Sequence, residues 1–207
     1  MLGGTQAICS KVGHLNLPPL VCTDGPRSFN LMRIIRGRHR GKILIAPKHL
    51  PVRPTTDMAK EGLFNLMENY VDWHEIRALD LFAGTGNISF ELVSRGCLDV
   101  TAVDANRECL KFIQKTAEQL GYEELKPIQF EAIHYLRKCI GKWDFIFADP
   151  PYDYEAYDSL VAMALDRLED DGMFALEHGA SIDLSEKPSF IEQRRYGSVH
   201  FSYFGKP

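Results

Sequence analysis

The sequence predicts an α/β fold in which helices cover both faces of a doubly wound, mostly parallel seven-stranded sheet. Two observations lead to this prediction. From Ile76 onward, short apolar runs alternate with segments of helical length, a rhythm typical of parallel sheets because each crossover between strands needs a helix. Residues 189–204 instead have strand-forming residues on both sides of Gly197, which predicts an antiparallel pair at the C-terminal end of the sheet.

The first 31 residues differ from the rest of the chain. They contain the breakers Gly3-Gly4, Pro18-Pro19 and Gly25-Pro26 and show no sustained periodicity. We therefore interpret residues 1–31 as a poorly ordered leader. Met32 directly precedes a basic segment, and we hypothesise that it is the biological start. The intact mass of the native protein tests this hypothesis.

A small β-hairpin and then a helix are predicted to follow. Apolar and basic residues alternate in places over residues 33–47, which favours a hairpin with basic side chains on one face. Pro54 disfavours a helix before it, and Thr55 or Thr56 can cap a helix after it. We expect that helix to run to about Tyr70. The side chains expected to face the core are Leu63, Phe64, Met67 and Tyr70.

The remaining elements follow from apolar runs and from glycines that stop helices. Gly96 and Gly121 each end a segment of helical pattern, because a glycine readily adopts the left-handed conformation that closes a helix. The expected parallel strands are 77–82, 99–103, 127–130, 143–148 and 172–177. The expected helices are 87–95, 107–120, 132–140 and 154–168.

Charge is distributed unevenly along the chain. The net charge is −4, but residues 33–53 contain seven basic residues and no acidic one, which leaves 17 basic against 28 acidic residues elsewhere. A positive segment on an acidic body suggests an arm that binds anions, and a merely solvated basic face is the alternative. The seven residues are Arg33, Arg36, Arg38, Arg40, Lys42, Lys48 and Arg53.

Composition excludes several classes of protein. The chain has 207 residues, 45% of them hydrophobic, which suits one globular domain. No stretch approaches the ~20 apolar residues of a membrane helix, and residues 1–20 lack the pattern of a secretory signal. The five cysteines are odd in number and badly spaced for a disulfide framework or a metal site, so Cys97 and Cys109 are expected to be core thiols. We expect a cytoplasmic monomer without a metal.

A ligand pocket is predicted beyond the carboxyl ends of the parallel strands, where open sheets of this kind bind ligands. Gly84 and Gly86 follow the first strand and let the backbone turn sharply and approach a ligand. Asp104 lies 18 residues after Gly86, where a carboxylate can accept hydrogen bonds from two ribose hydroxyls; capping the next helix is its alternative role. The residues expected to bind a cofactor are Asp80, Phe82, Ala83, Gly84, Thr85, Gly86, Asp104, Ala105, Glu131 and Ala132, the last two beside an adenine edge.

The negative charge of Asp80 in this predicted pocket indicates which kind of cofactor the pocket binds. A dinucleotide site needs a third glycine where this chain has Ser89. Asp80 would repel a pyrophosphate, whereas its carboxylate suits the positive amino group of a methionine moiety. The sequence therefore predicts S-adenosylmethionine and disfavours a nicotinamide oxidoreductase, and calorimetry with both cofactors would decide between them.

Three motifs together resemble those of class I methyltransferases, which have a Rossmann-like fold. They are Asp80-Leu81-Phe82-Ala83-Gly84-Thr85-Gly86, Asp104 and Asp149-Pro150-Pro151-Tyr152. With Arg33-Ile34-Ile35-Arg36-Gly37 and Arg53-Pro54-Thr55-Thr56-Asp57, the chain from about Met32 onward is similar to the bacterial family that methylates guanine N2 in 16S ribosomal RNA. Proteins of that family usually begin near the position of Met32. One departure is Asn87-Ile88-Ser89-Phe90, where smaller, more apolar residues are expected.

The motif Asp149-Pro150-Pro151-Tyr152 is expected to be catalytic. Its two prolines remove two backbone donors and stiffen the turn, so the motif can accept hydrogen bonds. The Asp149 carboxylate and the Pro150 carbonyl would hold the two protons of an exocyclic amine, and Asp149 would stabilise the positive charge that develops on the nitrogen. Tyr152 would stack on the base. The alternative is a plain turn, but an apolar strand precedes the motif and Gly86 lies 63 residues before Asp149.

The predicted domains are a leader over residues 1–31, a basic RNA-binding arm over 32–57 and a methyltransferase domain over 58–207. The arm is expected to contact RNA through Arg33, Arg36, Arg38, Arg40, Lys42, Arg53 and Thr55. The residues alone predict methylation of an amino group; the resemblance implies guanine N2 in 16S ribosomal RNA, either free or within an assembling small subunit. The rivals are an adenine-N6 methyltransferase of DNA or RNA and a catalytically silent RNA-binding protein of the same fold.

Overall fold

The computed structural model describes residues 30–48, 50 and 55–205 of the chain. The proposed leader, apart from its last two residues, lies outside the described residues, as do Arg53 and Pro54. The described part begins with an antiparallel hairpin of β1 (Asn30–Arg33) and β2 (Ile43–Ala46). The hairpin prediction is confirmed, but β1 starts two residues before Met32, because the backbone of Asn30 and Leu31 pairs with Ala46 and Ile45.

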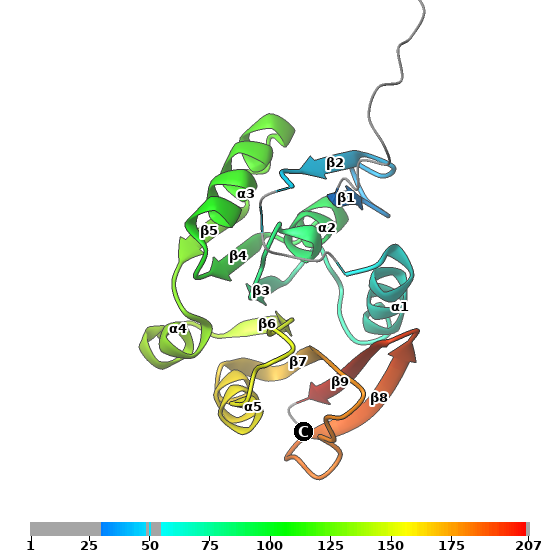
Figure 1. The fold of residues 1–207 in the computed structure, drawn as a ribbon, viewed down its shortest axis with the longest axis vertical. Helices are drawn as coiled ribbons and strands as arrows, with labels where there is room; N and C mark the ends of the chain where they lie inside the picture. Colours follow the sequence, from blue (N-terminus) through cyan, green and yellow to red (C-terminus); the bar gives the residue numbers. More distant parts are fainter. Residues whose placement is uncertain (1–29, 49, 51–54, 206–207) are drawn as a thin grey trace, which may run out of the picture.

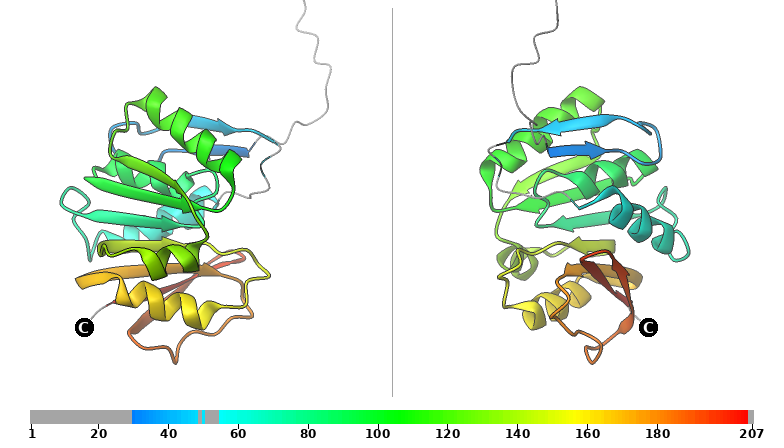
Figure 2. Two further views of the ribbon diagram at one scale, coloured as in Figure 1. Left: turned by 90° about the vertical axis from the view of Figure 1, so that its left-hand side faces the viewer. Right: turned by 45° about the vertical axis from the view of Figure 1, so that its right-hand side comes forward.

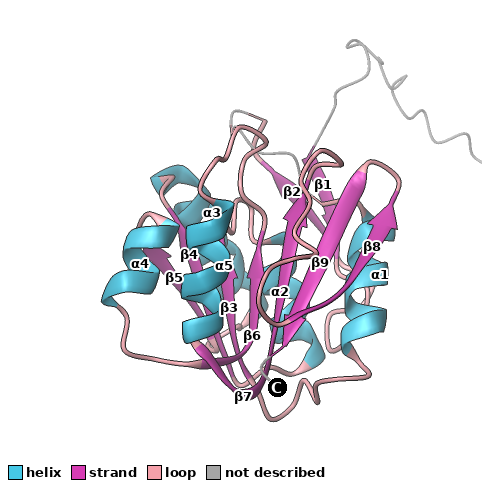
Figure 3. Cartoon of the chain, turned by 90° about the horizontal axis from the view of Figure 1, so that it is seen from below, coloured by secondary structure: helices cyan, strands magenta, loops and turns pink. Residues whose placement is uncertain are grey.

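Seven strands form the central sheet, in the order β5-β4-β3-β6-β7-β9-β8 (Figures 1 and 3). Neighbours from β5 to β7 pair in parallel, and β9 pairs antiparallel with both β7 and β8. This confirms the predicted seven-stranded sheet with its antiparallel C-terminal end. The strands are β3 (Arg77–Leu81), β4 (Asp99–Asp104), β5 (Leu125–Gln129), β6 (Trp143–Ala148), β7 (Leu168–His178), β8 (Phe190–Tyr196) and β9 (Val199–Gly205).

Helices cover both faces of this sheet, so the fold is doubly wound as predicted. The helices are α1 (Asp57–Met67), α2 (Asn87–Arg95), α3 (Arg107–Leu120), α4 (Ala132–Lys138) and α5 (Tyr157–Asp166). Successive strand residues point to opposite faces: Ala78 packs in the core under α1, α2 and α3, whereas Leu79 packs under α4 and α5. The hairpin lies on the α2 and α3 side of the molecule, away from α4 and α5 (Figures 1 and 2).

Several boundaries differ from the prediction. α1 ends at Met67 and Tyr70 is 46% exposed, so Tyr70 does not face the core. β5 begins at Leu125 and contains Pro127, which it tolerates because it is an edge strand. α4 ends at Lys138, short of the predicted 140. α5 begins at Tyr157 rather than at 154, and Leu168, predicted in that helix, opens β7.

The hairpin does not present the predicted basic face. Its inner side chains, including Met32 and Leu44, are buried, whereas its outward side chains are the apolar Leu31, Ile43 and Ile45, each more than half exposed, and the basic Arg33. The predicted basic residues between positions 36 and 42 fall in the connection between the two strands. Alternation between apolar and basic residues was therefore a poor guide to the hairpin's faces. Among the helices in the described part of the chain, none is long and apolar enough to cross a bilayer.

Candidate active site

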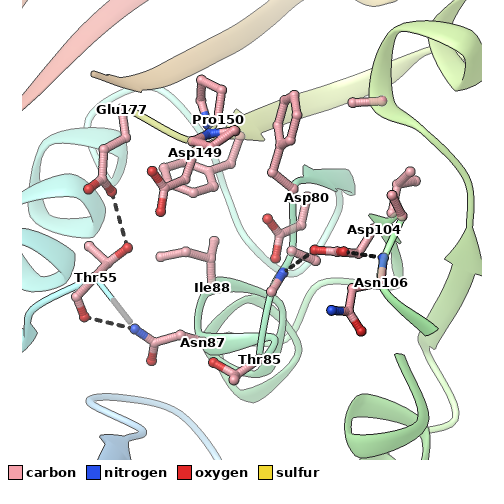
Figure 4. A pocket seen from close by; sticks show the side chains of 18 of the residues that line it. Thr55, Asp80, Thr85, Asn87, Ile88, Asp104, Asn106, Asp149, Pro150 and Glu177 are labelled. Carbon is pink, nitrogen blue, oxygen red and sulfur yellow. Dashed lines mark hydrogen bonds between the residues drawn. The ribbon is translucent and has the colours of Figure 1, made fainter. Parts of the chain in front are cut away.

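A cavity of about 490 Å³ opens at the carboxyl ends of the parallel strands (Figure 4). It brings together most of the residues predicted for the cofactor and for catalysis. Gly84, Asp104 and Tyr152 line the same cavity, so the glycine turn, the carboxylate predicted to bind ribose and the motif predicted to be catalytic share one space. The predicted residues in its wall are Asp80, Phe82, Ala83, Gly84, Thr85, Asp104, Ala105, Glu131, Ala132, Asp149, Pro150, Pro151 and Tyr152.

The glycine turn after β3 is left-handed at both glycines, with φ of 53° at Gly84 and 76° at Gly86. Gly84 lines the cavity, but Gly86 does not. Gly86 is the N-cap of α2, and a Cβ on it would come within 2.9 Å of Ile113. The requirement for glycine at position 86 therefore comes from the turn and from packing against α3.

Asp104 is fixed by backbone donors on both sides of its carboxylate. Oδ2 accepts from the Gly84 amide at 2.7 Å, and Oδ1 accepts from the Asn106 amide at 2.7 Å. The alternative role as a helix cap is wrong, because the N-cap of α3 is Asn106, whose side chain accepts from Glu108 and Cys109. Each carboxylate oxygen retains a second lone pair for a ligand hydroxyl.

Asp80 is buried beneath the glycine turn and points toward the cavity (Figure 4). Its Oδ2 accepts from both the amide and the hydroxyl of Ser89. Burial raises the pKa of Asp80 to about 7, against the opposing effect of the Ser89 hydrogen bonds. Ser89, where a dinucleotide site has glycine, thus serves to hold this carboxylate.

Asn87, part of the same departure from the expected sequence, connects the cavity to the basic arm. Its Nδ2 donates to the Thr55 carbonyl at 2.9 Å, and its Oδ1 accepts from Lys60 Nζ at 2.8 Å. Lys60 is buried and also donates to the Arg33 carbonyl. The polar start of α2 therefore fastens α1, the hairpin strand β1 and the segment at Thr55 to α2.

The predicted adenine side of the cavity lies at the start of α4. Glu131 caps this helix by accepting from the Ile133 and His134 amides. Both carboxylate oxygens are engaged in the cap, while Phe130 and Ala132 flank Glu131 in the cavity wall. An adenine ring at this position would meet the Phe130 ring and backbone groups more readily than the Glu131 carboxylate.

The motif Asp149-Pro150-Pro151-Tyr152 follows the buried strand β6. Asp149 lies inside the cavity, whereas Tyr152 is 77% exposed at its mouth. The Pro151 carbonyl accepts from the Tyr154 amide; among the described residues, no donor bonds to the Pro150 carbonyl. The motif thus presents a carboxylate, an available carbonyl and an exposed aromatic ring, as expected for recognition of a base with an amino group.

Sequence reasoning missed one carboxylate in this cavity, Glu177 on β7. Ala148, the last residue of β6, pairs with Leu176 of β7, so Asp149 directly after β6 comes beside Glu177 on β7. The signal in the sequence was an acidic residue after the apolar run 173–176, of the same kind as Asp149 after β6. Thr55, expected at the entrance, lines the cavity and donates from Oγ1 to Glu177 Oε2 at 3.1 Å.

The cavity is strongly acidic. Among the described residues, its lining contains five carboxylates and no lysine, arginine or histidine. Burial, followed by the charges of Glu177 and Asp80, raises the pKa of Asp149 well above its usual range. Burial also raises the pKa of Glu177 to about 7, opposed by its bond from Thr55. This wall favours a positively charged ligand and disfavours phosphates. The five residues are Asp80, Asp104, Glu131, Asp149 and Glu177.

These raised pKa values predict how stability depends on pH. A carboxyl whose pKa is higher in the folded protein binds its proton more tightly there, so its contribution to stability is lost as pH rises through the folded-state pKa. We expect the free energy of unfolding of the ligand-free protein to fall between about pH 5 and about pH 8, and to fall less in Glu177→Gln. Urea unfolding at several pH values in this range measures the free energy of unfolding, and Glu186→Gln, at an exposed position, is the control. If the free energy falls equally with pH in wild type and in Glu177→Gln, the raised pKa of Glu177 is contradicted.

The connection between β1 and β2 lies along α2, away from the cavity, although the arm's later residue Thr55 lines the cavity. The Arg38 amide donates to the Ser94 carbonyl near the C-terminal end of α2, and the cavity lies at the N-terminal end of that helix. Nine residues of α-helix span about 13 Å. The connection that carries most of the predicted RNA-binding residues is therefore one helix length from the proposed catalytic motif.

Three of the predicted phosphate-binding arginines are paired with carboxylates. Arg33 contacts Asp57, Arg36 contacts Glu68 and Arg38 contacts Glu124. Among the described residues, no carboxylate forms an ion pair with Arg40 or Lys42, both of which are exposed. Arg33, Arg36 and Arg40 also line one cavity of about 480 Å³, together with the single carboxylate of Glu61. The arm thus retains a basic surface, with Arg40 and Lys42 as its least neutralised members.

Comparison with known proteins agrees with this geometry. A sequence model of the family described as Conserved hypothetical protein 95 matches residues 32–205. The chain is 34% identical over 161 residues to YlbH of Bacillus subtilis, provisionally named an rRNA methyltransferase, covering 75% of this chain and 86% of that protein. It is 30% identical over 146 residues to ribosomal RNA small subunit methyltransferase D of Escherichia coli, covering 70% and 71%.

Solved structures share the fold. The provisionally titled methyltransferase yhhF of Escherichia coli superposes with a TM-score of 0.72 at 26% identity, covering 85% of this chain and 98% of that chain. A Thermus thermophilus 16S rRNA N2-guanine methyltransferase, solved with AdoMet and guanosine, gives a TM-score of 0.67 at 19% identity, covering 86% of this chain and 50% of that chain. The second similarity concerns the fold alone.

Proposed function

Because the chain belongs to the family described as Conserved hypothetical protein 95, whose members include S-adenosylmethionine-dependent methyltransferases of ribosomal RNA, we propose that it methylates the N2 amine of a guanine in 16S ribosomal RNA. One observation carries this proposal: a cavity walled by carboxylates ends at a catalytic motif that accepts hydrogen bonds and carries an exposed aromatic ring. A positively charged cofactor fits the wall, and an amine of an unstacked base fits the motif.

The residues of the cavity match S-adenosylmethionine. Asp104, held by the amides of Gly84 and Asn106, accepts from the two ribose hydroxyls. The turn at Gly84 admits the cofactor close to the backbone. Asp80 has both described hydrogen bonds on Oδ2, so Oδ1 serves the positively charged methionine amine. When bound, the cofactor supplies a methyl group on a positively charged sulfur.

In the proposed reaction, the motif holds and orients the target amine. The Asp149 carboxylate and the Pro150 carbonyl each accept one N–H, which turns the nitrogen lone pair toward the methyl group. With the cofactor bound, the nitrogen would take the methyl group from sulfur, and the carbon–sulfur bonding pair would remain on sulfur. The amine would then carry a positive charge and lose one proton, which the Asp149 carboxylate can accept. Tyr152 stacks on the base, which must leave its helix to reach the cavity.

Mass spectrometry of ribosomal RNA from cells that lack the gene tests the proposed function. We expect one N2-methylguanine to be lost from 16S RNA and to return with the wild-type gene. Loss of an N6-methyladenine would instead support the rival substrate, and an unchanged set of modifications would support a silent RNA-binding protein. Offering free 16S RNA and small subunits to the purified protein then identifies which form is methylated.

The exposed basic residues of the arm are expected to supply phosphate contacts. Each lost contact lowers the dependence of log K on log salt by about 0.7 for single-stranded RNA, so Arg40→Ala/Lys42→Ala should lower that slope by about 1.4. Binding to 16S RNA fragments at several salt concentrations measures it. Arg137→Ala is the control, because Arg137 is an exposed residue of α4, which covers the face of the sheet opposite the arm; an unchanged slope in the double variant would refute the role of the arm.

A further inference from the structure

Glu177 is built into the catalytic end of the cavity, although no part of the reaction described above uses it. It stands beside Asp149 because β6 and β7 pair in register there, and only 7% of it is exposed. Figure 4 shows its carboxylate on the same side of the cavity as that of Asp149, above Thr55 and Asn87. Two neighbouring carboxylates therefore face the place where the target amine must lie.

The orientation of Glu177 is fixed by residues far from it in the chain. Thr55 Oγ1 donates to Glu177 Oε2 at 3.1 Å, and the Thr55 carbonyl in turn accepts from Asn87 Nδ2 at 2.9 Å. Asn87 is itself held by the buried Lys60. Because this chain of hydrogen bonds uses Oε2, it leaves Oε1 of Glu177 for a group inside the cavity.

The Watson–Crick edge of guanine matches such a pair of carboxylates. Guanine presents two adjacent donors, the N1–H and the N2 amine, whereas adenine presents an acceptor at N1 beside its N6 amine. An ionised carboxylate can only accept hydrogen bonds. A base that supplies a donor beside its amine satisfies the second carboxylate, and a base that supplies an acceptor there leaves two lone pairs facing each other.

We propose that Glu177 is the specificity-determining residue of the site: its carboxylate accepts the guanine N1–H while Asp149 accepts the N2 amine. This inference rests on the proposed function and extends it from the motif to the strand beside it. The hydrogen bond from N1–H to Glu177 also explains why a motif that methylates amino groups would select guanine over adenine. A site that hydrogen-bonds one donor rejects a close analogue lacking that donor, because its own buried polar group is then left unpaired.

A guanine analogue without the N1 proton tests the contact directly. 2-Aminopurine retains the 2-amine but has an acceptor at N1 and no O6. Small subunits would be reconstituted around 16S RNA carrying guanine or 2-aminopurine at the target position, and kcat/KM for methyl transfer measured for wild type and Glu177→Gln. We expect wild type to lose at least about tenfold on 2-aminopurine. Glu177→Gln should lose at least about tenfold on guanine but little on 2-aminopurine, because the glutamine amide can donate to the N1 acceptor.

The outcomes separate this inference from the proposed function. Equal losses of Glu177→Gln on both RNAs, or no discrimination by wild type, would overturn the N1 contact and leave methylation of guanine intact. If wild type transfers no methyl group to guanine, either in free 16S RNA or in small subunits, both the proposed function and the contact between Glu177 and N1–H are overturned. S-adenosylmethionine binding, measured by calorimetry, verifies that Glu177→Gln is folded, and the wild-type comparison decides even where that variant fails to fold.

Discussion

Replacing Asp149 by alanine is expected to reduce methyl transfer by at least about 10³-fold, because it removes both the acceptor that orients the amine and the charge that stabilises it. The dissociation constant of S-adenosylmethionine should stay nearly unchanged, since Asp104 and Asp80 belong to other strands. Single-turnover transfer of a labelled methyl group measures the first quantity, and calorimetry measures the second.

The isosteric Asp149→Asn separates geometry from charge in the same assay. Its amide oxygen still accepts one N–H of the amine, so we expect partial activity, between wild type and Asp149→Ala. Asp153→Ala is the matched control, because Asp153 is an exposed carboxylate four residues further along the chain. Turnover by Asp149→Ala at the wild-type rate would remove the catalytic assignment.

Replacing Glu91 by alanine is expected to cost about 3–5 kcal/mol of unfolding free energy, because it leaves buried charges and amides without their partner. Glu91 is fully buried on α2. Its carboxylate accepts from the amides of Ile35 and Arg36 at 2.7 and 3.0 Å, and from Arg95 Nε at 2.8 Å. Lys60 Nζ lies 3.8 Å away, and burial lowers the pKa of Lys60 while Glu91 raises it.

Denaturant unfolding with circular dichroism measures this loss. Glu61→Ala is the control, because Glu61 is 47% exposed and lies 3.6 Å from Arg33; an exposed pair of this kind contributes about 0–1 kcal/mol. Since Glu91 ties the hairpin backbone to α2, the variant should also expose the hairpin to limited proteolysis before the sheet unfolds. A loss no larger than that of Glu61→Ala would mean that Glu91 does not anchor the arm.

The regular elements around the cavity could be predicted because their signals are local. α2 and α3 begin and end where the pattern indicated, and their C-caps, Gly96 and Gly121, have φ of 113° and 65°. β6 matches its apolar run from Trp143 to Ala148. Predictions failed where packing overrides local pattern: Leu168 has helical surroundings in sequence, but it belongs to β7, where its backbone pairs with Trp143.

The polar start of α2 shows the limit of reasoning from motifs. In the sequence, Asn87 and Ser89 stood out as departures from an apolar expectation, and Ser89 also as a missing glycine, but neither observation gave the residue a role. Their hydrogen-bond partners explain why these two positions are polar. Asn87 bonds to Thr55 and Lys60, which are far from it in sequence, and Ser89 bonds to Asp80 on β3. A polar side chain in a buried position needs a partner, but the sequence does not say which one.

The sequence by itself determined that Asp80, Asp104 and Asp149 would share one cavity, because the carboxyl ends of parallel strands meet at one edge of a sheet whatever fills the rest of the molecule. Only the tertiary structure decided which further side chains line this cavity and which of the predicted RNA-binding residues are neutralised by ion pairs. Thr55 reaches Glu177 across 122 positions, and Arg38 is neutralised by Glu124 across 86. Such pairings depend on strand register and helix packing, which bring side chains together through space and leave no periodic trace along the chain.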